Sequence, residues 1–231
     1  MRSSSAISPL LVVVAAVFVT CLIAANTIAV KQTDILGFAL PAAVVVFPIS
    51  YIFGDILTEV YGYRMARRVI WLGFFCNLLF VAFAWIGQLM PLVPPVWGAG
   101  EQAAYERILG FTPHILVASF AAYLVGEFAN SFVLARMKIV TKGRWLWTRT
   151  IGSTIVGQGL DSAIFLSLLA VFGVLPSFIV FGMILNHWLF KTGFEVVATP
   201  FTYVVANYLK KRDGVDTYDY DTNFNPLLVT D

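Results

Sequence analysis

Ionisable side chains inside long apolar stretches are the residues of this sequence with the clearest capacity for chemistry. They are Asp55, Glu59, Glu127, Asp161, His187, Lys191 and Glu195. A charge at the centre of a bilayer costs at least about 2.5–3.5 kcal/mol on insertion scales, so such residues mark functional sites by default. Carboxylates, an amine and an imidazole can hydrogen-bond a polar solute or exchange protons. These residues therefore predict a polar binding site in an oily interior.

The composition indicates a membrane protein. Of the 231 residues, 59% are hydrophobic and 12% are charged, and the mean hydropathy is +0.84. A soluble domain has about 45–50% apolar and about 25% charged residues. These figures exclude a disordered chain and a disulfide scaffold. Cys21 and Cys76 both lie in apolar runs, which supports neither a disulfide framework nor a metal site.

The elements that position the polar residues are predicted to be helices. An apolar stretch of about 20 residues crosses the hydrocarbon as a helix. The sequence predicts an all-α integral membrane protein whose domain, residues 1–212, has six spans: Ile7 to Asn26, Ile35 to Leu57, Val69 to Met90, His114 to Ala135, Thr150 to Gly173 and Ser177 to Leu209. Residues 98–109 predict a short amphipathic helix on the membrane surface. Residues 213–231 are expected to form a loose polar cytoplasmic tail.

Two of the spans are expected to depart from a regular helix. Pro41 and Pro48 each remove a backbone donor from the second span, which predicts a broken helix with free carbonyl groups. The sixth span is too long for a plain crossing. We expect it to kink near Pro200 or to begin as a shorter half-helix around Gly182.

Basic residues set the expected orientation, because Lys and Arg near a membrane accumulate on its cytoplasmic side. A six-span arrangement places 12 of the 15 basic residues on one face, which predicts that both termini are cytoplasmic. Residues 2–26 also resemble a cleaved signal peptide. We favour a retained helix, because the apolar run is long for a signal core.

Polar side chains recur at helical spacing in three further spans. They are Tyr123, Glu127, Asn130 and Ser131 in the fourth, Thr154, Gln158 and Asp161 in the fifth, and His187, Lys191, Glu195 and Thr199 in the sixth. Gly152, Gly157 and Gly159 allow close helix packing. Together these faces predict a polar cavity for a small planar solute rather than a metal ion, because no acidic or histidine cluster has ligand spacing.

Structural explanations exist for some of these residues. Glu59 lies near the cytoplasmic end of its span, where it can pair with Arg64 or Arg67. Lys191 and Glu195 are four residues apart and can neutralise each other. A lone histidine such as His187 is typical of a satisfied core residue.

The sequence contains no Gly-x-x-x-x-Gly-Lys-Ser/Thr motif, which excludes ATP binding by a P-loop. No cofactor is predicted, and energy must come from an ion gradient, a partner chain or metabolic trapping.

Three motifs carry a family resemblance. The string F-P-I-S-Y-I-F-G-D-I-L-T-E-V-Y-G-Y-R, residues 47–64, resembles the signature of the queuosine-precursor transporter family, which is grouped with vitamin uptake transporters. The agreement continues in residues 149–162 and in Lys191, Glu195, Thr199-Pro200 and Tyr203. The resemblance covers residues 10 to 212; the first ten residues and the tail lie outside it.

The resemblance implies import of 7-cyano-7-deazaguanine, or of its aminomethyl or free-base form, across the bacterial inner membrane for tRNA modification. It implies a transporter rather than an enzyme, with no nucleic-acid partner. We expect no ATPase subunit, and spans one and three could form a homodimer contact.

Chemistry suggests roles for the site residues. A deazaguanine presents a ring N–H and an exocyclic amine side by side, and one carboxylate can accept both hydrogen bonds. We expect Asp161 or Glu127 to bind this edge. The groups expected to hydrogen-bond the carbonyl and the nitrile are Gln158, Asn130 and Asn186, and those expected to balance charge, which could also couple a proton, are Lys191 and Glu195. Gating or coupling is expected of Asp55, Glu59 and His187.

Two other functions are alternatives to import by this chain alone. A substrate-binding subunit of an energy-coupling-factor importer would need a separate ATPase module. Around the first span, its small-residue pattern Ala-x-x-x-Ala matches only Ala25 and Ala29, which lie too far along. A membrane hydrolase would need a base next to a nucleophile, as His187 with Ser162 or Ser167, and no local motif supports that pairing.

Overall fold

The computed structural model describes residues 8–35, 38–91, 99–110 and 113–228. The helices are α1 (Pro9–Ile28), α2 (Phe47–Tyr61), α3 (Tyr63–Leu89), α4 (Ala99–Leu109), α5 (Pro113–Val140), α6 (Leu146–Val171) and α7 (Ser177–Asp213). A short antiparallel hairpin, β1 (Gln32–Ile35) and β2 (Phe38–Pro41), and a 3-10 turn, η1 (Ala42–Val45), precede α2. The predicted all-helical architecture is confirmed apart from this hairpin.

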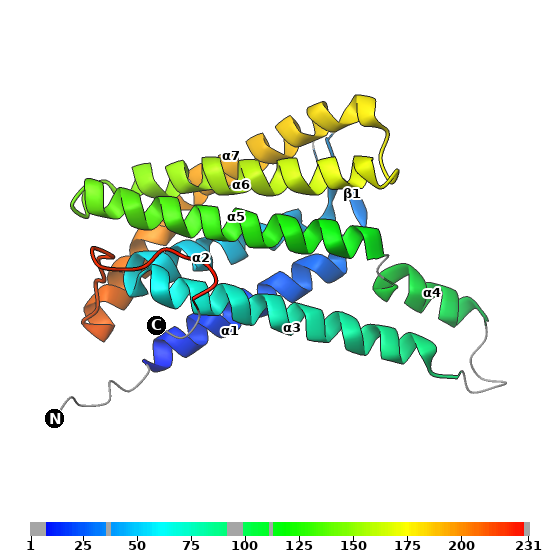
Figure 1. Ribbon diagram of the computed structural model, residues 1–231, viewed down its shortest axis with the longest axis horizontal. Helices are drawn as coiled ribbons and strands as arrows, with labels where there is room; N and C mark the ends of the chain where they lie inside the picture. Colours follow the sequence, from blue (N-terminus) through cyan, green and yellow to red (C-terminus); the bar gives the residue numbers. More distant parts are fainter. Residues whose placement is uncertain (1–7, 36–37, 92–98, 111–112, 229–231) are drawn as a thin grey trace.

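The long helices run roughly along one axis, with α5 and α6 side by side (Figure 1). The first turn of α1 and the last turn of α7 lie at the same end of the molecule, where Ser8 donates a hydrogen bond to Asp213 over 2.5 Å. The short helix α4 lies at the other end. This arrangement agrees with termini on one face.

Helix α1 packs into the core along one stripe. Its buried residues recur every three or four positions: Leu11, Val14, Phe18, Leu22 and Ala25. The intervening Val12 and Val13 are more than half exposed. An apolar stripe facing protein and an equally apolar outer face are expected where lipid replaces water.

Within the described residues, four helical stretches are long and apolar enough to cross a membrane: α1, α3, α6 and the one that contains α5. The protein is therefore a multi-pass membrane protein. Helix α2 has only 15 residues, and polar side chains dilute the apolar character of α7. The second and sixth spans thus remain predictions.

The second predicted span is not one helix from residue 35. Strand β2 ends at Pro41, the chain then turns through η1, and α2 begins at Phe47. Pro48 lies in the first turn of α2, where its missing N–H is not needed. The sixth span is one 37-residue helix that passes Gly182 and contains Pro200, so the half-helix alternative is wrong.

Helices α5 and α6 approach closely at two glycines. A Cβ atom at Gly157 would lie 2.6 Å from the Cβ of Asn130, and one at Gly126 would lie 2.8 Å from the Cβ of Asp161. The predicted packing role of Gly157 is confirmed. The crossing places neighbouring polar residues of the two helices against each other.

The C-terminal segment is not the loose extension that the sequence suggested. The backbone N–H of Thr217 donates to the carbonyl of Val60 over 3.1 Å, and Asp219 accepts a hydrogen bond from the N–H of Tyr63 over 3.0 Å. Arg67 donates to the carbonyl groups of Asn223 and Asn225. Backbone polar groups of the tail therefore find partners on α2 and α3.

Candidate functional site

Polar side chains of α2 and α5 meet in the interior. The side chain of Asp55 is fully buried, and Asn130 donates a hydrogen bond to its Oδ1 over 2.6 Å. A Cβ at Gly54 would lie 3.3 Å from a carboxylate oxygen of Glu127. The absence of a side chain at Gly54 thus lets the Glu127 carboxylate approach α2.

Helices α6 and α7 contribute an ion pair. Lys191 Nζ lies 2.5 Å from Asp161 Oδ2, and the two side chains are 15% and 21% exposed. The interpretation that Lys191 pairs with Glu195 is therefore wrong. The packing of α7 against α6 brings Asp161 to Lys191, whereas helical spacing alone suggested Glu195, one turn after Lys191, as the partner.

An aromatic pair lies beside this ion pair. The rings of Phe47 and Tyr51 are stacked, with centroids 6.1 Å apart and planes inclined by 7°. The ammonium group of Lys191 is 5.6 Å from each ring centroid, within cation–π range. Neither ring was predicted as a site residue, although both share the four-residue spacing of Asp55 and Glu59 and so lie on the same face of α2.

Electrostatic interactions join these groups into one cluster. The charges of Glu195 and Glu127 act on Asp55, and those of Asp161 and Lys191 act on Glu127. Of the charged residues that the sequence predicts for one site, the structure therefore brings Asp55, Glu127, Asp161 and Lys191 together.

Several buried oxygen atoms of this cluster have no hydrogen-bond partner among the described residues. They are Asp55 Oδ2, Asn130 Oδ1, Gln158 Oε1 and Glu195 Oε1. A buried polar group without a partner costs about 1–3 kcal/mol. Because these atoms are carboxylate or amide oxygens, the cluster is suited to a solute rich in hydrogen-bond donors.

Two expected residues lie at the margin. Asn186 is on an exposed face of α7, apart from the buried cluster. His187 is half-buried and is subject to the charges of Lys191 and Asp161. The Ser162 hydroxyl has no hydrogen-bond partner in the described part of the chain, so no base contacts it there.

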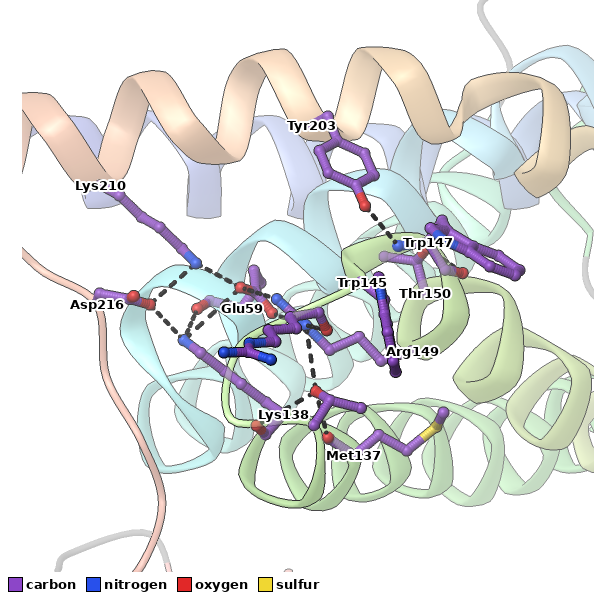
Figure 2. A network of polar contacts seen from close by, with 12 residues as sticks. Glu59, Met137, Lys138, Trp145, Trp147, Arg149, Thr150, Tyr203, Lys210 and Asp216 are labelled. Carbon is purple, nitrogen blue, oxygen red and sulfur yellow. Dashed lines mark hydrogen bonds and ion pairs between the residues drawn. The ribbon is translucent and has the colours of Figure 1, made fainter.

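Glu59 belongs to a separate network at the end of α2 (Figure 2). Arg149 donates to both carboxylate oxygens over 2.7 Å, and Lys210 lies 2.5 Å from Oε1. The predicted partners Arg64 and Arg67 are wrong. Arg67 instead binds tail carbonyls, because α3 turns away from α2 at Gly62, where φ is +84°.

The tail completes this network through Asp216. Its carboxylate lies 2.6 Å from Lys138 Nζ and 2.9 Å from Lys210 Nζ. Partial burial raises the pKa of Asp216, but the hydrogen bonds from Lys138 and Lys210 lower the pKa by more, so that the net shift is below the usual value. The acid is therefore ionised at neutral pH and holds the tail against two lysines.

Other features lie apart from the polar cluster. A groove between α3 and α5 has an apolar lining that includes Leu78, Trp85 and Phe120. Among the described residues, no group of three or more histidine, cysteine or acidic side chains is arranged to hold a metal ion. The polar cluster between α2, α5, α6 and α7 is thus the candidate solute site.

A multi-pass membrane protein with a polar cluster among its helices has the character of a transporter of small solutes. Residues 41–205 match the family model described as "Putative vitamin uptake transporter", and the chain belongs to this family. It is 30% identical over 188 residues to the "Probable queuosine precursor transporter" of Bacillus subtilis (strain 168), which covers 81% of this chain and 80% of that protein. No solved structure matches the chain.

Proposed function

We propose that this protein imports queuosine precursors across the bacterial inner membrane, with 7-cyano-7-deazaguanine as the preferred solute and both termini in the cytoplasm. The name of the relative from Bacillus subtilis supports this function. So do the span-two signature, with Asp55 and Glu59, and the linked motifs of the fifth and sixth spans.

The observation that carries the proposal is the set of buried oxygen acceptors beside a stacked aromatic pair. A deazaguanine is flat and presents two adjacent N–H donors. Carboxylate and amide oxygens accept from such an edge, and an aromatic side chain stacks on the ring face. A site with these acceptors discriminates strongly against analogues that lack a donor, because its own groups would be left unpaired.

The ion pair between Lys191 and Asp161 bears on which acid, Asp161 or Glu127, binds the donor edge of the solute. Asp161 is already bound to Lys191, so Glu127 is the better candidate to accept from the ring N–H and the exocyclic amine. The Lys191 ammonium can donate to the carbonyl oxygen of the solute. The partial exposure of Lys191 and Asp161 supports entry of the solute at this part of the cluster.

Uptake of labelled 7-cyano-7-deazaguanine tests the function. A queuosine-requiring bacterium that lacks its own importer and energy-coupling-factor modules should accumulate the label when it expresses this chain. Unlabelled 7-cyano-7-deazaguanine should compete with the label, guanine should not, and the recovered base should be chemically unchanged. A host that gains no uptake would contradict the proposal, and uptake only with added ATPase modules would favour the energy-coupling-factor alternative.

The substitution Glu127→Gln tests the site. The neutral amide presents one acceptor oxygen and one NH₂ donor instead of two acceptors, so uptake should fall by at least tenfold while the protein remains in the membrane. Uptake at the parental rate would remove Glu127 from the site. No ATPase subunit is needed for this function, and a homodimer through α1 and α3 is compatible with it.

A further inference from the structure

The four helices that carry the polar cluster are also joined by the network around Glu59 (Figure 2). Glu59 of α2 accepts two hydrogen bonds from Arg149 of α6 over 2.7 Å. Lys210 of α7 lies 2.5 Å from the same carboxylate, and Lys138 of α5 lies 3.7 Å from it. One buried carboxylate thus holds a basic side chain from each of the three other helices.

This network lies beside the polar cluster, toward the end of the molecule where α7 ends. On α2, Glu59 follows Asp55 by about one turn, and on α5, Lys138 follows Asn130 by about two turns. Helix α6 runs the other way, and Arg149 is in its first turn. A solute that leaves the cluster toward this end must pass the network, and in the proposed orientation this end faces the cytoplasm.

The tail covers the network from the solvent side. The Asp216 carboxylate is 44% exposed and lies 2.6 Å from Lys138 Nζ and 2.9 Å from Lys210 Nζ. Lys138 also donates to the backbone carbonyls of Glu59 and Thr217. Because Asp216 comes just after the end of α7, these contacts hold that end against α2 and α5.

The members of the network differ in how easily they separate. Glu59 and Arg149 are both buried, and breaking a buried pair leaves an uncompensated charge in the interior. The partly exposed Asp216 can move into water at little cost. Once it has left, Lys138 and Lys210 share one acid with Arg149, and the two ammonium groups repel each other. Departure of Asp216 therefore loosens the network without leaving a buried acid unpaired.

We propose that this network is the inner gate of the transporter and that Asp216 is its latch; this inference rests on the proposed function. While the tail is docked, the polar cluster is closed toward the cytoplasm. When Asp216 leaves, repulsion between Lys138 and Lys210 moves the end of α7 away from α5, and the solute is released. Pro200 lies inside α7 between the cluster and the network and removes a backbone hydrogen bond, so α7 can bend there.

The first experiment measures access to the space that the gate closes. Thr154 is 2% exposed and lies on α6 between the network and the cluster. In the full chain with Cys21→Ala and Cys76→Ala, Thr154→Cys is treated with a membrane-impermeant thiol reagent on inside-out vesicles. Adding Asp216→Asn should speed labelling about fivefold, the equivalent of one partly exposed ion pair. The control Asp221→Asn, an exposed acid of the same tail, should leave the rate unchanged.

A second cysteine separates gating from general loosening of the fold. Ala118 is fully buried on α5, on the side of the polar cluster away from the network. Labelling of Ala118→Cys from the cytoplasmic face should stay slow when Asp216→Asn is added. Faster labelling at both cysteines, or an unchanged rate at Thr154→Cys, overturns the proposal.

A reversible lock tests whether the gate opens during transport. In Lys138→Cys/Asp216→Cys, a bifunctional methanethiosulfonate reagent links the tail to α5 through disulfides. Uptake of labelled 7-cyano-7-deazaguanine should then fall at least tenfold and recover when a reductant cleaves the link. Uptake that the link does not slow overturns the gate while the proposed function stands. If the parent protein takes up no label, the proposed function fails, and the labelling of Thr154→Cys still decides whether the network closes this end.

Discussion

Glu59 and Arg149 are ninety positions apart in the sequence and form a bidentate ion pair in which both N–H···O distances are 2.7 Å. Both side chains are at most 1% exposed. The pair joins the last turn of α2 to the first turn of α6, and Lys210 ties the same carboxylate to the end of α7. One acid thus fixes the relative positions of three helix ends.

Removing the guanidinium should destabilise the protein. In Arg149→Ala, Glu59 keeps only its lysine partners, and breaking a buried ion pair costs about 3–5 kcal/mol. The thermal unfolding midpoint of the detergent-purified protein should fall clearly below that of the parent. Arg212→Ala, which removes an exposed basic residue near the end of α7, should leave the midpoint unchanged; equal midpoints for both variants would mean that the pair contributes little.

Tail docking should depend on pH through Asp216. Because the folded-state pKa of this acid lies below its usual value, its contribution to docking is present above the unfolded pKa and is lost as pH falls through the folded pKa. The hydrogen-exchange protection factors of residues 214–228, which correct for the intrinsic slowing of exchange in acid, should therefore fall as the pH is lowered. Asp216→Asn should show fast exchange already at neutral pH, and protection that is equal in the parent and the variant would contradict this role.

The close crossing of α5 and α6 should not tolerate a methyl group. In Gly157→Ala the new Cβ would lie 2.6 Å from the Cβ of Asn130, so the helices must separate and move the polar residues of α5 away from α6. We expect at least tenfold slower uptake from a protein that still inserts into the membrane. Gly182→Ala, where no described residue beyond the local helix backbone lies within 4 Å of the added Cβ, is the matched control and should transport normally.

The ring of Tyr51 should contribute to solute affinity. Stacking of a base on an aromatic side chain is worth about 1–3 kcal/mol by alanine substitution, so Tyr51→Ala should raise the half-saturation concentration for 7-cyano-7-deazaguanine at least fivefold. Tyr51→Phe keeps the ring and should stay near the parental value. Phe181→Ala, at a site 72% exposed on α7, is a control for loss of aromatic area. An unchanged concentration for Tyr51→Ala would place the solute away from this ring.

Local patterns account for the predictions that succeeded. Composition alone identified a membrane protein, because too few charged residues are present to cover a soluble surface. Four of the predicted spans overlap helices of the described chain that are long and apolar enough to cross a membrane. The four-residue spacing of Lys191 and Glu195 correctly put them on one side of α7, because helical periodicity depends only on the backbone.

Partner choice was decided by tertiary structure. Spacing suggested Glu195 for Lys191 and Arg64 or Arg67 for Glu59, whereas the actual partners are Asp161 and Arg149. In each case the ion-pair partner is a residue on a helix further away in the sequence, and not the residue nearer in sequence. The docking of the tail through Asp216 was likewise invisible in the sequence, since a polar segment with spaced aspartates is equally typical of a free end.

The sequence by itself therefore determined that the protein lies in a membrane, that its long elements are helices and that buried acids such as Asp55 and Glu127 face inward, because these follow from hydropathy and the period of the helix. Only the tertiary structure decided which charges neutralise each other and which buried acids are left without a cation. That distinction depends on distances between helices far apart in the chain, and a buried charge is compensated by whatever lies within a few ångströms of it.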